Sequence, residues 1–356
     1  MSRLQTLLAK IAGGRPVMDE DLAGFDFGAA DLAGGIFLRC DLRRANLAGC
    51  KLCRATFSGC DLTGASLEGA RLDGASLVQC VLAGVTAAGL CIERLVLTRC
   101  DLSGSDWRGL QLSQGAWAEC TLDDASLSGA RLERSALVRC SLKRTDLSDA
   151  SLLSSALPEA DLRSARLKGF AADATLMSKG DFSGQDLRGL RLTRCNLQEA
   201  CFDGADLSGA DLSGACCLRA SFGKARLDEA LAGNALLMES RWQHTEARGM
   251  FLEGAILKGA RLEHCNLENA RLARAMLSHS MHRDVSFRGA DMRHADLSHA
   301  VFERVDFAQV DFSWGRHHDT RFEHCSFIGA RRKNAFGTDA TLLAAERAAG
   351  VLETAS

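Results

Sequence analysis

The sequence predicts an all-β solenoid built from 20-residue coils, and two periodicities lead to this prediction. Leucine or phenylalanine stands at nearly every fifth position from Leu22 to Phe327, and the frame never shifts. Neither a helix nor a strand has a period of five, so the repeating unit must be a larger one. Cysteine also returns every 20 residues at one place in this unit: Cys40, Cys60, Cys80, Cys100, Cys120 and Cys140. A coil of four units places these thiols in one column.

Each five-residue unit has a large apolar residue at its centre and a small residue two positions earlier, such as Ala45 or Cys60. The residue directly before the centre is often Asp or Asn, as in Asp41 and Asn46. Close packing inside a narrow coil explains why large and small inward residues alternate. Glycine and the Asp or Asn residues are expected at the corners. The centre is small or polar at a few positions: Ala87, Ala172, Cys217, Ala232, Ala247, His282 and His317.

This A(D/N)LXX pattern resembles the pentapeptide-repeat family, and the resemblance covers residues 20–330. It implies a right-handed quadrilateral β-helix, that is, a pentapeptide-repeat solenoid with four units in each coil. With neighbouring strands about 4.8 Å apart, about 15 coils give a rod of roughly 75 Å. Two stretches follow the pattern poorly, and we expect a bulge or a small loop in each: residues 169–180 and 228–240.

The two ends of the chain differ from the repeat, and both are expected to carry short capping helices because a solenoid exposes strand edges at its ends. Residues 1–19 are predicted to form a helical cap, residues 20–330 the β-helix, and residues 331–356 a tail with a helix. The N-terminal helix is predicted from apolar residues at helical spacing: Leu4, Leu7, Leu8 and Ile11.

The C-terminal helix is expected over residues 338–353, with Gly350 as its stop signal. In dimeric members of the family a C-terminal element makes the dimer contact. The resemblance therefore implies a dimer contact here, and a plain cap is the alternative. The candidate dimerisation residues are Leu342, Leu343, Val351 and Leu352.

Composition and motifs argue against several function classes. The 356 residues have a net charge of -2, so no bulk field draws the chain to nucleic acid or to an anionic membrane. The N-terminus lacks the apolar core of a signal peptide and the chain lacks a spanning apolar run, so the 15 cysteines are expected to be reduced thiols in a bacterial cytoplasm. No GxSxG motif or Walker loop occurs, and we predict neither enzyme activity nor a cofactor.

The nine histidines all fall between His244 and His324. One outward column at 20-residue spacing contains His279, His299 and Asp319, and two histidines with a carboxylate form a metal-ligand set. The three residues form a straight ladder rather than converging on a point. A solvated polar column is therefore the preferred interpretation, and no metal is predicted.

Sorting the outward residues by side of the coil gives the strongest functional prediction. Three sides are mostly polar, whereas the fourth carries one charge, Lys258, between residues 36 and 278. Such a stripe could cover about 600 Å², and exposed apolar patches of that size mark binding surfaces. We predict a protein-binding face for a second copy or another protein, formed by Ile36, Leu38, Val78, Val96, Val138, Leu176, Leu218, Leu236, Met238, Ile256 and Met276.

Two other functions follow from the family resemblance. Some members mimic DNA and bind gyrase, and one line of acids here fits that activity: Asp21, Asp41, Asp61, Asp101, Asp161 and Asp181. The same line turns to Arg241, Arg261 and Arg321, and the chain has 43 Lys and Arg against 45 acids, which weakens this alternative. Similar long repeat proteins accompany contractile, type VI-like secretion systems, so an accessory or adaptor role is a further alternative. The preferred prediction is a non-enzymatic, rod-shaped interaction scaffold.

Overall fold

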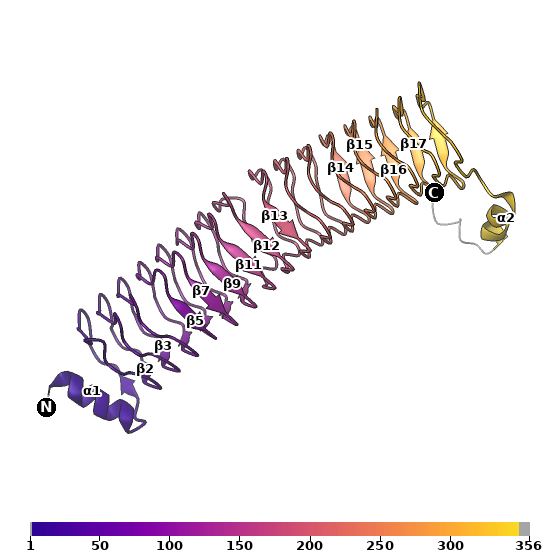
Figure 1. The fold of residues 1–356 in the computed structure, drawn as a ribbon. Helices are drawn as coiled ribbons and strands as arrows, with labels where there is room; N and C mark the ends of the chain where they lie inside the picture. The colour runs from indigo at the N-terminus through magenta and orange to yellow at the C-terminus, as the bar shows by residue number, and fades with distance from the viewer. Residues whose placement is uncertain (1, 349–356) are drawn as a thin grey trace. The chain divides into compact units, whose positions relative to one another are not determined.

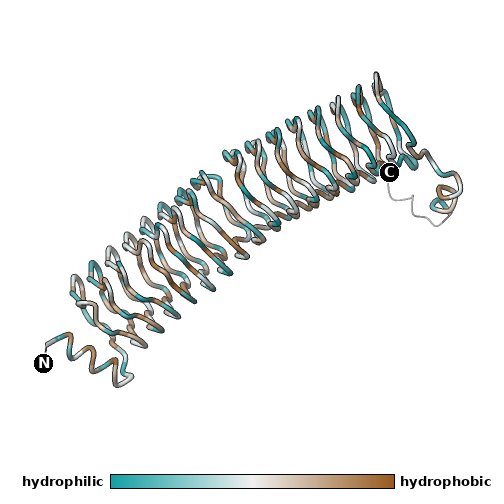
Figure 2. Tube along the Cα trace, in the orientation of Figure 1, coloured by the Kyte–Doolittle hydropathy of each residue, from teal (hydrophilic) through white to brown (hydrophobic). Residues whose placement is uncertain are grey.

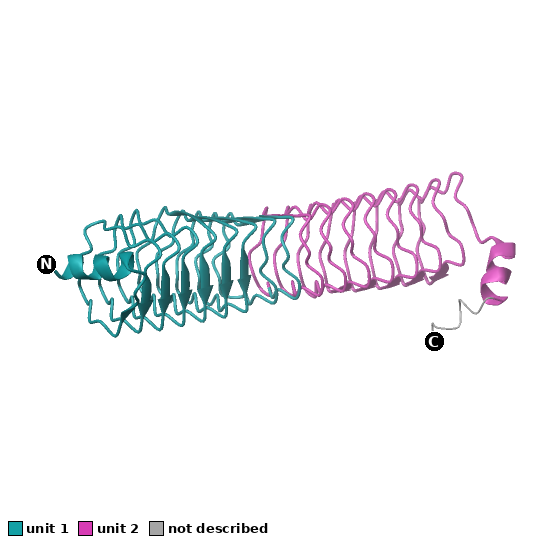
Figure 3. Ribbon diagram, turned by 90° about the horizontal axis from the view of Figure 1, so that it is seen from below, with its two compact units in different colours: residues 1–181 teal, residues 182–356 magenta. Residues whose placement is uncertain are grey.

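The computed structural model describes residues 2–348, which form coils of parallel β-structure and two α-helices (Figure 1). The coils divide into two compact units, residues 1–181 and 182–356 (Figure 3). Helix α1 (Arg3–Ala12) belongs to the first unit and α2 (Ala340–Ala348) to the second. Each unit is a quadrilateral β-helix, which confirms the predicted fold class.

The strand register confirms the 20-residue coil. The Cα partners in neighbouring strands are residues i and i+20, for example Phe37 with Phe57 and Phe302 with Phe322. Each coil has four sides, which we name by the centres they contain. Sides A, B, C and D begin at Leu22, Phe27, Leu32 and Phe37, and each continues at every twentieth residue.

The strands of the first unit lie on sides D and C. Side D holds a seven-stranded parallel sheet in the order β1-β2-β3-β4-β6-β8-β10, and side C holds β5, β7, β9, β11 and β12. The bounds are β1 (Val17–Met18), β2 (Ile36–Leu38), β3 (Thr56–Ser58), β4 (Ser76–Val78), β5 (Cys91–Glu93), β6 (Val96–Thr98), β7 (Gln111–Ser113), β8 (Ala116–Ala118), β9 (Arg131–Glu133), β10 (Ala136–Val138), β11 (Ser151–Leu153) and β12 (Ala171–Asp173).

In the second unit the longest sheet lies on side A. It has five strands in the order β14-β15-β16-β17-β18, and single parallel bridges join the other sides. The bounds are β13 (Arg191–Thr193, on side C), β14 (Arg241–Gln243), β15 (Arg261–Glu263), β16 (Met281–Arg283), β17 (Val301–Glu303) and β18 (Arg321–Glu323). Apolar and polar segments alternate along the coils of both units (Figure 2).

The Asp or Asn before each centre has a local structural role. Asp41 Oδ1 accepts a hydrogen bond from the backbone N–H of Arg43 at 3.1 Å, and Asn46 Oδ1 accepts one from Ala48 at 3.1 Å. These residues therefore close Asx turns on the sides of the coil, which corrects the expectation that they lie at the corners. The corner residue is two positions after the centre and has positive φ. Glycine meets this requirement at Gly24, with φ of +63°.

The stacked cysteines behave as small core residues that also form hydrogen bonds. Cys60 Sγ donates to the carbonyl of Phe37 at 3.4 Å, and Ser135 Oγ makes the equivalent bond to Leu112 at 3.3 Å. Cysteine and serine thus share one function at the small position, which is to fill it and satisfy a carbonyl from the coil below. All cysteines are free thiols, and burial raises the pKa of Cys265.

Two of the three tryptophans at centres have a serine two positions earlier, whereas Trp117 has Gly115 there and an indole N–H without a partner among the described residues. The indole N–H of Trp107 donates to Ser105 Oγ at 2.8 Å, and that of Trp242 donates to Ser240 Oγ at the same distance. Most buried N–H groups in proteins have such a partner. At Trp107 and Trp242 the serine hydroxyl supplies it within a core made mostly of leucine.

The two poorly matching stretches contain no insertion, so the expected bulges are wrong. In residues 169–180 the register continues through the pair Leu152 and Ala172. In residues 228–240 Leu236 bridges Ile256 in the ordinary 20-residue register. Small centres are tolerated here because the backbone bonds between coils do not depend on side-chain size.

Candidate protein-interaction surface

In the first unit, side D presents its predicted apolar residues to the surface. Ile36, Val96 and Leu176 are 36–38% exposed. Leu38, Val78 and Val138 are half-buried. The parallel register places these residues in two rows along the coils, where they alternate with small uncharged residues such as Thr56, Ser76 and Ala116, so the strip is uncharged along its length.

In the second unit the apolar residues of side D extend over four successive coils. Cys216, Leu236, Ile256 and Met276 bridge one another in that order, and Met276 is 42% exposed. Leu218, Leu236, Met238 and Ile256 are half-buried. Every residue predicted for the binding face therefore points outward on side D.

Ion pairs run along the corner between sides D and A, and they were not predicted from the sequence. Glu119 binds Arg99 on the coil below and Arg139 on the coil above, each at 2.8 Å. Arg219 and Glu239 form a similar pair at 2.7 Å in the second unit. These residues are spaced by 20 in the sequence, but they lie at the corner and not beside a centre, where the apolar residues of side D are found. The charges pair with one another at the corner and leave the side itself apolar.

Helix α2 lies against the C-terminal coils of side D. A pocket of about 350 Å³ separates the helix from the coils, with Ser298 and His318 from side D and Leu342 and Glu346 from α2 among its lining residues. Leu342 is 48% exposed and Leu343 is half-buried. Val351 and Leu352, the other dimerisation candidates, lie outside the described residues.

His318 connects α2 to the solenoid through both ring nitrogens. Its Nδ1 accepts the backbone N–H of Asp339 at 3.1 Å, so its proton is on Nε2, which donates to Glu346 at 3.1 Å. Glu346 Oε2 also lies 3.6 Å from His299 Nε2. We call the two hydrogen bonds of His318 the α2 clasp.

The residues that converge here differ from the predicted ladder. Ligand atoms of His299, His318 and Glu346 lie within 4.8 Å of one another, a spacing that could hold a metal ion. A metal at His318 Nε2 would require the ring proton on Nδ1, where it would clash with the N–H of Asp339. The hydrogen bonds therefore fit a clasp better than a metal site.

The predicted ladder itself is partly formed. His299 Nδ1 lies 3.4 Å from Asp319 Oδ2, whereas His279 stacks on the His299 ring at 4.7 Å and adds no converging ligand atom. Burial and the neighbouring charge of His299 lower the pKa of His279. Sequence spacing could not reveal Glu346 because it reaches the ladder only through the fold of the tail.

Removing the Glu346 carboxylate should loosen α2. Because a typical hydrogen bond contributes about 1 kcal/mol, Glu346→Ala should raise amide exchange over residues 340–348 about fivefold. Hydrogen exchange followed by mass spectrometry measures this directly. Glu323→Ala, on an exposed glutamate of side A, is the matched control; equal exchange in both variants would show that the clasp contributes nothing.

Arginines neutralise several members of the acidic line on side A. Arg43 holds Asp41 through two hydrogen bonds and lowers the pKa of that carboxyl to about 2. Arg163 pairs with Asp161 in the same way. A phosphate mimic requires sustained negative potential, so these pairs weaken the support for DNA mimicry.

The fold defines a class of protein, the β-solenoid repeat proteins. The profile described as pentapeptide repeats matches the chain in eight copies, over residues 21–59, 60–94, 125–163, 178–214, 237–274, 255–281 and 283–315. The chain belongs to the pentapeptide-repeat family.

Solved structures include similar proteins. HetL, a pentapeptide repeat protein involved in heterocyst differentiation regulation in the cyanobacterium Nostoc, is 22% identical, with 70% of this chain and 87% of HetL covered and a TM-score of 0.27. QnrB1, a plasmid-mediated fluoroquinolone resistance protein, is 19% identical, with 56% and 89% covered and a TM-score of 0.30. No curated protein matches the chain. Neither described helix has the length and apolarity needed to cross a bilayer.

Proposed function

We propose that the protein is a non-enzymatic interaction scaffold that binds a second copy of itself through side D. The observation that supports this proposal is the alignment of exposed apolar residues along one of four sides in both units. Scattered apolar residues are ordinary on protein surfaces, but their alignment along one side is not. Stacked core side chains fill the interior of the described coils, so a substrate would have to bind outside them.

The size of the strip is compatible with self-association. Counted over both units, about 600 Å² on each copy gives a total near 1,200 Å², the lower end of specific interfaces. We therefore expect a reversible dimer rather than a permanent one. Gyrase binding and a secretion-adaptor role stay predictions, and no contact in the structure favours either of them over self-association.

The test is the substitution of two apolar residues of side D by aspartate. Leu236→Asp together with Ile256→Asp places two unpaired charges in the proposed contact, which should abolish dimerisation and leave the circular dichroism spectrum unchanged. Light scattering after size exclusion, over a concentration series, measures the mass.

Leu231→Asp together with Phe251→Asp is the matched control. These two apolar residues bridge each other on side C of the same coils, so their substitution should leave the dimer intact. A monomeric wild-type protein at every concentration, or equal loss of dimer in both double variants, would contradict the proposal.

A further inference from the structure

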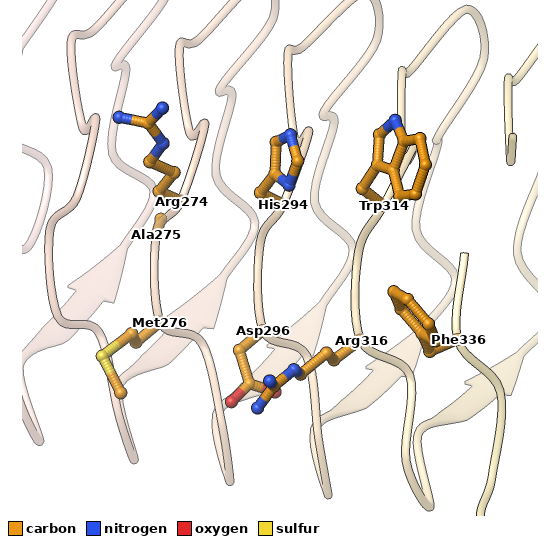
Figure 4. Close-up of a pocket in the computed structure, with 8 residues that line it drawn as sticks. All are labelled: Arg274, Ala275, Met276, His294, Asp296, Trp314, Arg316 and Phe336. Carbon is orange, nitrogen blue, oxygen red and sulfur yellow. The ribbon is translucent and has the colours of Figure 1, made fainter. Parts of the chain in front are cut away.

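A groove of about 400 Å³ lies on the second unit, between side D and the corner that joins sides C and D. Figure 4 shows two rows of side chains that run across successive coils. The corner row consists of Arg274, His294 and Trp314, and the row on side D consists of Met276, Asp296, Arg316 and Phe336. The floor between the rows is low because the small position of the repeat lies there, as at the buried residue Ala275.

Trp314 is unusual among the tryptophans of this chain. The other three occupy centres and are 1% exposed, whereas Trp314 is 45% exposed at a corner with φ of +63°. Arg274 and His294 have the same left-handed conformation at the equivalent corners, so the feature that distinguishes Trp314 is the exposure of its ring. Phe336 across the groove is 58% exposed. The core needs neither ring, so both are available to a ligand.

The groove contains two arginines and one carboxylate, so its net charge is positive. Neither Arg274 nor Arg316 forms an ion pair within residues 2–348, whereas Arg293 nearby pairs with Asp291 at 2.7 Å. The carboxylate in the groove, Asp296, accepts hydrogen bonds from the N–H and hydroxyl of Ser298 through Oδ1. Two guanidinium groups are thus free to receive carboxylates from outside.

We infer that this groove binds a short acidic peptide segment with an aromatic residue. The carboxylates of the segment bind Arg274 and Arg316, and its ring packs against Trp314 and Phe336. Arg274 and Trp314 are two coils apart, about 10 Å, which is the length of about three extended residues. This inference goes beyond self-association through side D: Met276 belongs to both surfaces, but Leu236 and Ile256, the residues substituted in the dimer test, do not line the groove.

Tryptophan fluorescence and calorimetry together test the inference. The probe is the peptide acetyl-Asp-Glu-Phe-Glu-Asp-amide, titrated into the full chain at low salt. It should shift the emission of the exposed Trp314 in a saturable way, and Trp314→Phe should remove this signal while calorimetry still detects binding. Arg274→Ala and Arg316→Ala should each weaken binding about tenfold, as expected for a lost charge-assisted hydrogen bond.

The controls separate the groove from general electrostatic attraction. Arg261→Ala removes an exposed arginine from side A of the same unit and should leave the affinity unchanged. A peptide with lysine in place of each acid should not bind. The inference is overturned if the acidic peptide gives no saturable signal, if Arg261→Ala weakens binding as much as Arg274→Ala, or if inorganic phosphate alone binds as tightly as the peptide.

Discussion

Phe202→Ala is expected to lower the free energy of unfolding by about 3–5 kcal/mol. Phe202 stacks between Phe182 at 4.9 Å and Phe222 at 5.2 Å, and Phe222 in turn contacts Trp242 at 4.7 Å. Alanine leaves a cavity that this column cannot close, because the backbone bonds between coils fix their separation. Urea unfolding followed by circular dichroism measures the loss.

Phe202→Leu is the matched control, since leucine occupies most other centres of the repeat. Its cost should be less than half that of alanine because most of the buried volume remains. A cost below about 1 kcal/mol for Phe202→Ala would mean that the coils collapse around the missing ring, contrary to a stacked core of fixed spacing.

Acid should destabilise the protein through His282. This side chain is 2% exposed, stacks on Phe302 at 4.5 Å and contacts Ser280 Oγ at 2.8 Å. Desolvation lowers the pKa of His282 from 6.5 to about 3, so the unfolded chain takes up this proton before the folded one. The contribution of neutral His282 to the free energy of unfolding is fully present above pH 6.5 and is lost as the pH falls towards 3. At pH 5 the loss is about 2 kcal/mol.

His282→Leu should remove this part of the acid sensitivity. Ser280 keeps a partner in the variant because its hydroxyl also donates to the carbonyl of Leu277. The measurement is the difference in unfolding free energy between pH 7 and pH 5, compared with that of the wild type. His324→Gln, at an exposed histidine, should keep the wild-type difference. If His282→Leu also keeps the wild-type difference between pH 7 and pH 5, the buried imidazole is not the cause of the acid sensitivity.

The repeating part of the molecule was predictable because the five-residue and 20-residue spacings determine which residues point inward and which stack on one another. A side of five residues needs an inward residue at a fixed place, so Leu22 and Phe327 belong to the same pattern despite their separation. The outward direction of Leu236 and Ile256 follows from that frame. The bulges expected in residues 169–180 and 228–240 were wrong because small centres weaken the sequence pattern without changing the backbone register.

The non-repeating contacts were not predictable in the same way. The clasp depends on Glu346 of α2 meeting His318 of side D, and no spacing rule relates a helix to a coil. Trp314 did offer a signal, since it is the only tryptophan of the chain outside a centre position. Its significance became clear when the fold placed it at a left-handed corner, opposite Phe336.

The strict 20-residue register also limits how a gene for this protein can change length. Deleting one pentapeptide would turn every later residue onto the neighbouring side, so Leu236 and Ile256 would leave the strip to which Ile36 and Val96 belong. Deleting or duplicating a whole coil keeps all four sides in order and preserves the 20-residue bridges. Viable length variants should therefore differ by multiples of 20 residues, or 60 base pairs, within the repeat.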